Sequence, residues 1–228
     1  MALITQIKGD EKAKSSPVMK RNIELNSLQA QKVMTRSFEK LAESLFTISV
    51  ILRAVGERDH VDEAENLING HFEAVTVDLN EKLEQLRELV QQNGISVSPD
   101  YTNTVVFSIE INTPHLGRFA GLVTQLDELI TLIDALWLNA VFDSRQASNA
   151  KYEWRQRLIR VAGKIIGMAK RVRTEAYNNG NKEIVDKVAP AATTDEDMDE
   201  ELKKASEEPE TEAKAKPKKT TTKERKVA

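Results

Sequence analysis

The sequence predicts a mainly α-helical, internally duplicated bundle that carries a two-stranded antiparallel β-ribbon. Three observations lead to this fold class. Aromatic residues make up only 5% of the chain, and its apolar residues are mostly Leu, Ile, Val and Ala, a mix that favours helices. Two similar alternating phrases, Asn-Ile-Glu-Leu-Asn-Ser (22–27) and Ser-Ile-Glu-Ile-Asn-Thr (108–113), lie 86 residues apart. Each phrase is followed by two long stretches of helical periodicity, which predicts two strand-helix-helix units.

The predicted elements follow from the alternation and the periodicity. In order, they are a strand over residues 20–26, helices over 28–55 and 61–92, a strand over 102–112, and helices over 114–142 and 146–178. They divide the chain into a first unit at residues 20–93, a linker at 94–101 and a second unit at 102–180. Both units end in Asn-Gly, a pair that suits the left-handed conformation at a helix C-terminus.

The second helix of each unit carries an apolar stripe, and the two stripes match at the interval of 86 residues. The first stripe, Ala64, Ile68, Phe72, Val75, Leu79, Leu83, Leu86 and Val90, falls on Ala150, Trp154, Leu158, Val161, Ile165, Ala169, Val172 and Ala176. Spacings of three and four residues place each stripe on one helix face, as a buried core requires.

The first helices match less cleanly, because their apolar positions agree at an interval of 88 residues. Met34, Phe38, Leu41, Leu45 and Ile48 fall on Leu122, Leu126, Leu129, Ile133 and Leu136. We therefore expect a two-residue slip, absorbed at Thr113-Pro114, where Thr caps the helix and Pro takes its first position, and in a shorter loop after the helix. The matching strands, stripes and Asn-Gly ends together favour a duplication.

Each repeated phrase alternates apolar and polar residues, which predicts a strand with one face on a core and the other toward solvent. A lone strand leaves backbone groups unpaired, and the natural partner is the equivalent strand of the other unit, paired antiparallel about a pseudo-twofold axis. A two-stranded ribbon on helices is the arrangement of ribbon-helix-helix proteins, which place the ribbon in the DNA major groove. Two chains normally supply the two strands there, whereas one duplicated chain would supply both here.

The outward ribbon positions are candidates for contacts with DNA bases. They are Lys20, Asn22, Glu24 and Asn26 on the first strand, and Thr104, Val106, Ser108, Glu110 and Asn112 on the second. Asn can contact adenine, Glu can accept from cytosine N4, and Ser or Thr can contact several bases. The alternative is a solvated hairpin face or a surface for protein contacts, which two glutamates without a flanking arginine favour.

Phosphate contacts are expected at the N-termini of the first helices, where free amides and the helix dipole favour anions. The candidates are Arg21, Ser27, Lys32, Arg36, Thr113, His115 and Arg118. Ser27 and Thr113 are also the expected helix caps. For each basic residue taken singly, ordinary solvated surface charge is the alternative.

The two second helices carry opposite charges. Residues 61–93 hold eight acids against two bases, whereas residues 151–173 hold eight bases against one acid. The bases along one flank include Arg157, Arg160, Lys164 and Arg171. They are candidates either for binding phosphate groups or for pairing with the acidic helix, within the chain or between protomers. We favour pairing, because the matching apolar stripes indicate that the two helices are near neighbours.

The two ends of the chain differ from its body. Residues 1–19 are expected to form a flexible basic arm. Residues 190–213 carry ten acids against two bases, and residues 214–228 carry seven bases against one acid. Large apolar residues are scarce in this tail, so burial cannot offset the entropy cost of ordering it. We expect disorder over residues 190–228.

Several function classes are excluded or disfavoured. The sequence contains no cysteine, which excludes disulfides, thiolate metal sites and cysteine nucleophiles and fits a reducing cytoplasm. Its three histidines share no ligand spacing, and no glycine-rich phosphate loop or nucleophile motif is present. No apolar run approaches the roughly 18 residues of a membrane span. We expect a cytoplasmic, non-catalytic protein without a cofactor, metal site, small-molecule substrate or membrane contact.

Three phrases carry a family resemblance: Asn-Ile-Glu-Leu-Asn-Ser-Leu-Gln-Ala-Gln-Lys-Val (22–33), Asp-Glu-Leu-Ile-Thr-Leu-Ile-Asp-Ala-Leu-Trp-Leu (127–138) and Trp-Arg-Gln-Arg-Leu-Ile-Arg (154–160). In these phrases the chain resembles the AcaB-like proteins of conjugative plasmids and integrating conjugative elements. The resemblance extends over residues 20–178 and leaves out the tails. It implies a transcriptional activator of conjugative transfer genes with a ribbon-helix-helix fold.

The residues and the resemblance together predict a transcriptional regulator, an activator, that binds duplex DNA with its ribbon in the major groove. The alternative is a non-catalytic protein-interaction or scaffolding bundle of a mobile genetic element, with the charged helices as its docking surface. Duplex DNA is the expected partner. A second copy of the chain and other regulatory proteins are further candidates.

Overall fold

The computed structural model describes residues 17–55, 58–190 and 200–207. Its elements are, in chain order, β1 (Met19–Leu25), α1 (Leu28–Val55), α2 (Arg58–Gln92), β2 (Val105–Ile111), α3 (Pro114–Leu138), α4 (Ser144–Asn178), α5 (Lys182–Val188) and α6 (Glu200–Glu207). The described residues are therefore mostly helical and include a two-stranded antiparallel sheet. This confirms the predicted helical bundle with its two-stranded antiparallel ribbon.

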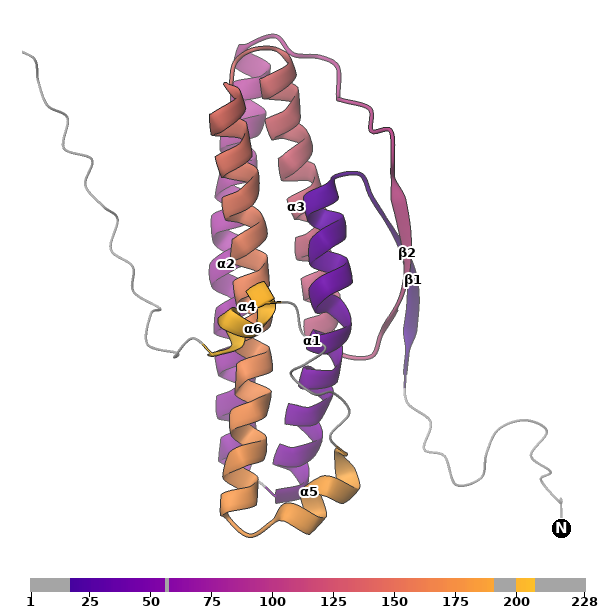
Figure 1. Cartoon of the computed structure of the whole chain (residues 1–228), viewed down its shortest axis with the longest axis vertical. Helices are drawn as coiled ribbons and strands as arrows, with labels where there is room; N and C mark the ends of the chain where they lie inside the picture. Colours follow the sequence, from indigo (N-terminus) through magenta and orange to yellow (C-terminus); the bar gives the residue numbers. More distant parts are fainter. Residues whose placement is uncertain (1–16, 56–57, 191–199, 208–228) are drawn as a thin grey trace, which may run out of the picture.

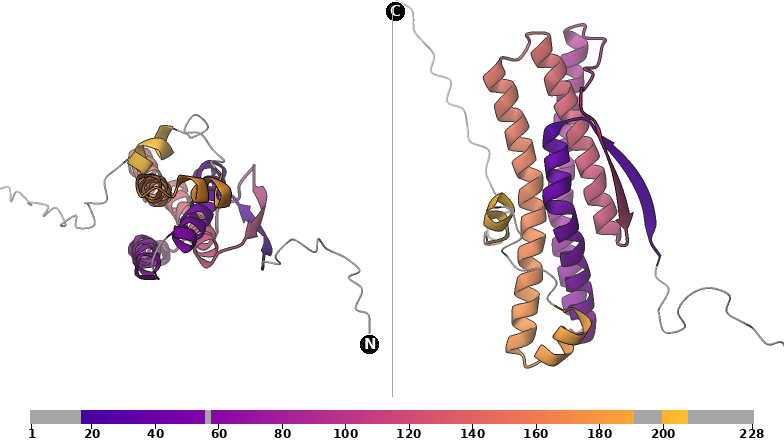
Figure 2. Two further views of the ribbon diagram at one scale, coloured as in Figure 1. Left: turned by 90° about the horizontal axis from the view of Figure 1, so that it is seen from below. Right: turned by 45° about the vertical axis from the view of Figure 1, so that its right-hand side comes forward.

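Four long helices, α1 to α4, form a bundle with the ribbon along one side (Figure 1). Helix α1 packs against α3 and α4, and α2 packs against α3. Strand β1 contacts both α1 and α3, and the short helix α5 packs on α1 and α4 at one end of the bundle. The ribbon and α6 lie on different sides of the bundle (Figure 2).

The core consists of the apolar stripes predicted from the sequence. All positions of the two stripes on α2 and α4 are buried or half-buried, and the equivalent pair Phe72 and Leu158 has no exposed surface. Leu41 of α1 and Leu126 of α3 are also fully buried in the same cluster. The helical periodicity therefore identified the faces that meet in the core.

Helix ends follow local capping chemistry. The Thr113 hydroxyl accepts a hydrogen bond from the Leu116 amide at 3.2 Å, with Pro114 in the first helical turn of α3. Gly94 and Gly180, the glycines of the two Asn-Gly pairs, have φ angles of +65° and +81°, the left-handed conformation expected there.

The α3–α4 connection differs from the prediction. Helix α3 ends at Leu138 and not at residue 142, because Ala140 turns the chain with a φ of 59° and the Val141 amide bonds back to the Leu136 carbonyl. Helix α4 then begins earlier than predicted, behind a capping box in which Asp143 and Gln146 each accept the other's backbone amide.

The element bounds repeat at an interval of 86 residues, except at the ends of α1 and α3. The bounds of β2 lie 86 residues beyond those of β1, and those of α4 lie 86 residues beyond those of α2. Helices α1 and α3 also start 86 residues apart, and the buried positions Ala30, Val33 and Met34 correspond to the buried Leu116, Phe119 and Ala120. The expected two-residue slip at Thr113-Pro114 is therefore wrong for the start of the helix. The single interval is what a duplication predicts, and the duplication itself stays a prediction.

Part of the tail is ordered, against the prediction of disorder over residues 190–228. Helix α6 packs on α4 and buries Leu202, Ala205 and Ser206. Two glycines of α4 permit the close approach: a Cβ on Gly163 would lie 2.3 Å from the Ala205 Cβ, and a Cβ on Gly167 would lie 2.3 Å from the Ser206 carbonyl oxygen.

An ion-pair cluster holds the same helix. Glu201 lies 3.0 Å from the Arg36 guanidinium of α1 and 2.8 Å from that of Arg155 on α4. The prediction of disorder is thus wrong for residues 200–207, because it considered only large apolar residues and not the small residues that pack against Gly163 and Gly167. Residues 191–199 and 208–228 lie outside the described residues, as do residues 1–16 of the predicted N-terminal arm.

Candidate nucleic-acid interface

The ribbon pairs its strands about their midpoints. Asn22 faces Ser108, and the antiparallel register extends from Met19 opposite Ile111 to Leu25 opposite Val105. Alternation gives the ribbon two faces. Ile23, Leu25 and Ile109 are buried on the inner face against the bundle.

The outer face presents six exposed side chains. They form three cross-strand pairs, Lys20 with Glu110, Asn22 with Ser108, and Glu24 with Val106. The Lys20 ammonium lies 2.9 Å from the Glu110 carboxylate, and this hydrogen-bonded ion pair raises the pKa of Lys20. Val106 is 60% exposed, so its side chain is available for contact. We call these six residues the outer face.

Four other ribbon candidates lie beyond this face. Thr104 and Asn112 are exposed but flank β2 outside the ladder. Arg21 is exposed, although it pairs with Ile109 and so shares the parity of the inner face. Asn26 is half-buried, and its side chain donates to the Asp127 carboxylate at 3.3 Å, so it turns toward α3.

The start of α1 is held by a buried carboxylate, Asp127, which is not among the candidates predicted from the sequence. Asp127 of α3 accepts the Asn26 amide at 3.0 Å and the Ser27 amide at 2.7 Å. Ser27 is 1% exposed, and its hydroxyl accepts the Ala30 amide at 3.3 Å. Ser27 is thus the predicted cap of α1, but it is a buried structural group and not one presented to phosphate.

A second buried side chain fixes the spacing of the strands at this end. The Gln31 amide nitrogen donates to the carbonyl oxygens of Leu25 and Asn103, both at 3.0 Å, and to that of Asn26 at 3.3 Å. It therefore connects the end of β1 to the segment before β2. A polar residue at a buried helical position was the sequence signal for both Gln31 and Asp127.

The start of α3 is tied to α2. His115 lies 3.2 Å from the Asn69 side chain and stacks on Phe72, and Arg118 bonds to Asn69 at 3.0 Å and to Glu73 at 2.9 Å. Burial lowers the pKa of His115, with a smaller opposing effect from Glu65 and a lowering one from Arg118. These two phosphate candidates are therefore engaged in helix packing.

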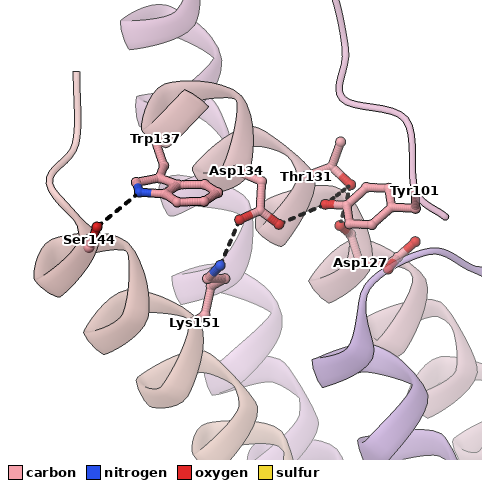
Figure 3. A network of polar contacts seen from close by, with 7 residues as sticks. All are labelled: Tyr101, Asp127, Thr131, Asp134, Trp137, Ser144 and Lys151. Atoms are coloured by element: carbon pink, nitrogen blue, oxygen red, sulfur yellow. Dashed lines mark hydrogen bonds and ion pairs between the residues drawn. The ribbon is translucent and has the colours of Figure 1, made fainter. Parts of the chain in front are cut away.

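The linker before β2 is anchored by a polar network (Figure 3). The Tyr101 hydroxyl donates to Asp134 at 2.9 Å, and the other oxygen of Asp134 accepts from Lys151 of α4 at 2.6 Å. Burial is the main cause that raises the pKa of Tyr101. Beside this chain of contacts, the Trp137 indole donates to Ser144 at 3.2 Å. The network fixes the path of the linker toward β2.

The basic residues of α4 bond to acids on several elements. Arg157 lies 2.9 Å from Asp78 of α2 and 2.8 Å from Glu153 of its own helix. Other bases of the helix reach Asp134 of α3 and Glu201 of α6. The expected pairing with the acidic helix therefore occurs at Arg157. Arg160 and Arg171 are exposed and Lys164 is half-buried.

Of the remaining phosphate candidates, Lys32 is half-buried on α1 and Arg36 is occupied by Glu201. The candidates near the starts of α1 and α3, together with Arg157 of α4, are thus largely engaged within the protein. The outer face is where the structure brings sequence-predicted candidates together: five of the six residues were predicted to contact bases, and Val106 was predicted to point outward.

Two further features are absent from residues 17–55, 58–190 and 200–207. No group of three or more His, Asp or Glu side chains there is arranged to hold a metal ion. None of the helices in those ranges combines the length and the apolar character that a membrane span requires.

A ribbon formed by two strands of one chain and backed by a four-helix bundle defines a ribbon-helix-helix-like fold in single-chain form. No family model matches the chain, and no curated protein matches it. Among solved structures, the chain is similar to the crystal structure of selenomethionine-containing AcaB from uropathogenic E. coli, with 45% sequence identity and a TM-score of 0.81. The match covers 85% of this chain and 98% of that one. The chain therefore belongs to the AcaB-like family.

Proposed function

We propose that this protein is a transcriptional regulator that inserts the outer face of its β1–β2 ribbon into the major groove of duplex DNA. The major groove, about 12 Å wide, admits a two-stranded ribbon. The family resemblance implies the biological role that belongs to this proposal, activation of conjugative transfer genes.

The observation that carries the proposal is the outer face itself. Asn22 and Ser108 lie exposed at the centre of the ribbon, with Lys20, Glu24 and Glu110 around them. Amide, hydroxyl, amine and carboxylate groups are the side-chain types that bond to base edges in the major groove. The ribbon is also rigidly placed, because Gln31 and Asp127 fix its end and Ile23 and Ile109 pack it on the bundle.

Phosphate contacts would come from basic side chains near the ribbon and not from the caps of α1 and α3. Arg21 is exposed on β1, and Lys32 lies half-buried near the start of α1. Such contacts position a protein on DNA without choosing its sequence.

One observation favours the alternative, a protein-interaction bundle. The outer face carries two carboxylates against one amine, and that amine is already paired with Glu110. This charge balance opposes the approach of DNA and would suit a basic surface of a partner protein. The two functions differ in whether the ribbon selects a DNA sequence.

The test is selection of bound duplexes from a random DNA pool with the full chain at two salt concentrations. A regulator enriches one motif that persists at the higher salt, because base contacts depend less on salt than phosphate contacts do. Binding without a motif, lost as salt rises, would reject base recognition and leave the scaffold as the function.

Variants locate the contact. Asn22→Ala should relax base preference at the centre of the motif, whereas the matched change Asn66→Ala, at an exposed position of α2, should change nothing. Arg21→Ala should weaken binding to all sequences alike and reduce the salt slope by about one. Equal effects of Asn22→Ala and Asn66→Ala would reject the ribbon as the DNA-contacting element.

A further inference from the structure

The ribbon has a pseudo-twofold axis, and its position can be read from the register. Each residue of β1 has a counterpart 86 positions later in β2. Asn22 is the residue of β1 that faces its own counterpart, Ser108, across the ladder. The axis therefore passes between Asn22 and Ser108, at the middle of the outer face.

The side chains on the outer face are not symmetric about this axis. The axis relates Lys20 to Val106, Asn22 to Ser108, and Glu24 to Glu110. Only the glutamates match, so β1 presents Lys-Asn-Glu where β2 presents Val-Ser-Glu. A ribbon made by two identical chains has no such difference.

The two ends of the outer face also differ in electrostatics. At one end, Lys20 neutralises Glu110 across the ladder at 2.9 Å. At the other end, Glu24 faces Val106, which is apolar and offers its carboxylate no partner. One end therefore presents an ion pair, and the other presents a carboxylate beside a methyl-bearing side chain.

These ends suit different base edges. A lysine donates to guanine O6 and N7, an asparagine bonds to adenine, an apolar side chain contacts the thymine methyl, and a glutamate accepts from cytosine N4. A DNA-binding protein with twofold symmetry reads a palindrome, because identical side chains meet identical half-sites. Here a palindrome would place one half-site against the wrong set of side chains.

We propose that the ribbon recognises a non-palindromic DNA element, so that one chain binds in one orientation relative to the sequence. The inference rests on the proposed function and adds directionality to it. A directional complex places the bundle, with α6 on a side other than the ribbon's, at a fixed position relative to a neighbouring gene.

The test compares the full chain with two reciprocal double variants in the same duplex selection. Lys20→Val with Asn22→Ser gives both strands Val-Ser-Glu, and Val106→Lys with Ser108→Asn gives both strands Lys-Asn-Glu. All four positions are exposed, so both variants should keep the fold, which melting curves check. Native mass spectrometry identifies complexes with one chain per duplex. This step is needed because two bound chains could enrich an inverted repeat of the element even though each chain binds one non-palindromic copy.

The unaltered chain should enrich a DNA element with two unlike halves. Replacing either half by the inverted repeat of the other half makes the element palindromic, and this change should weaken binding by about tenfold or more. Each double variant should enrich a palindrome, built from a different half of that element. A palindrome enriched by the unaltered chain at one chain per duplex would overturn the inference but keep the proposed function. The absence of any motif would overturn both.

Discussion

Helices α2 and α4 occupy positions 86 residues apart and have the same length, but they are buried to different extents. Helix α2 has a broad exposed acidic face, whereas α4 is buried against its bundle neighbours and also under α6. The seat for α6 consists of Gly163 and Gly167, and the corresponding positions of α2 hold Val77 and Glu81, both exposed. Equal periodicity thus produced two similar helices, and their different neighbours gave them different surfaces.

The largest expected effect tests what the two helices share. Phe72 and Leu158 are equivalent and fully buried. Phe72→Ala should lower the free energy of unfolding by about 3–5 kcal/mol, and Leu158→Ala by about 2–5 kcal/mol, because each leaves a cavity. Urea unfolding measures both losses. A loss below about 1 kcal/mol at either position would contradict its place in the common core.

The second prediction concerns a buried position at which the first and second units carry different residues. With α1 and α3 aligned from their starts, 86 residues apart, Asp127 corresponds to Leu41, and both are buried. Asp127→Leu copies the first half and leaves the Asn26 and Ser27 amides without their acceptor, so the free energy of unfolding should fall by about 2–3 kcal/mol. Asp127→Asn keeps one oxygen acceptor and should cost less. Equal losses for the two variants in urea unfolding would show that the amide contacts contribute little.

The third prediction compares the effect of replacing a glycine in α2 with that of replacing a glycine in α4. A Cβ on Gly70 of α2 would meet nothing within 4 Å, whereas one on Gly163 would lie 2.3 Å from the Ala205 Cβ. Gly70→Ala should stabilise the protein by about 0.5–1 kcal/mol, because alanine is the better helix former. Gly163→Ala should displace α6.

Hydrogen exchange by mass spectrometry distinguishes these outcomes. Amides of residues 200–207 should lose protection in Gly163→Ala and keep it in Gly70→Ala. An isolated helix of this length is unstable in water, so loss of the seat should release the whole helix. Unchanged protection in Gly163→Ala would contradict the packing of α6 on the two glycines.

The smallest expected effect is a pH dependence of the folding stability that arises from His115 in the second unit. Burial lowers the pKa of His115 in the folded state below its ordinary value of 6.5, so the unfolded chain binds the proton more readily. The contribution of His115 to stability is present above pH 6.5 and is lost as the pH falls through the lowered folded-state pKa. Glu65 and Arg118 face the same ring with opposite influence.

The test replaces His115 by Gln, the residue at the equivalent position 29 of the first half. Melting temperatures between pH 7.5 and pH 5 should fall more for the unaltered chain than for His115→Gln. Parallel curves for the two proteins would show that His115 does not titrate differently on folding.

Much of the backbone followed from local sequence patterns. Alternation over residues 22–27 and 108–113 predicted both strands, and the three-and-four spacing predicted the buried faces of all four long helices. Residue types on the outer face were also predicted, because a strand on a core must turn every second side chain to solvent. These patterns depend on the geometry of a single element, so the sequence alone determines them.

Contacts between distant segments were a different matter. The sequence placed Ser27, Arg36 and Arg118 near the starts of helices as polar groups. In the structure, the Ser27 amide donates to Asp127, while Arg36 pairs with Glu201 and Arg118 with Glu73. Which acid lies opposite which base depends on how whole helices pack, and no periodicity encodes it. The same holds for α6, whose small side chains gain burial only where Gly163 and Gly167 leave room.

The sequence by itself therefore determined the order of the elements, the faces that form the core and the polar character of the ribbon, since each follows from the repeat of one helix or strand. Only the tertiary structure decided that Asn22 meets Ser108 at the centre of the ribbon and that the candidate phosphate ligands at the helix starts are largely engaged within the fold. The physical reason is that register, ion pairs and close helix approach are fixed by packing many elements at once.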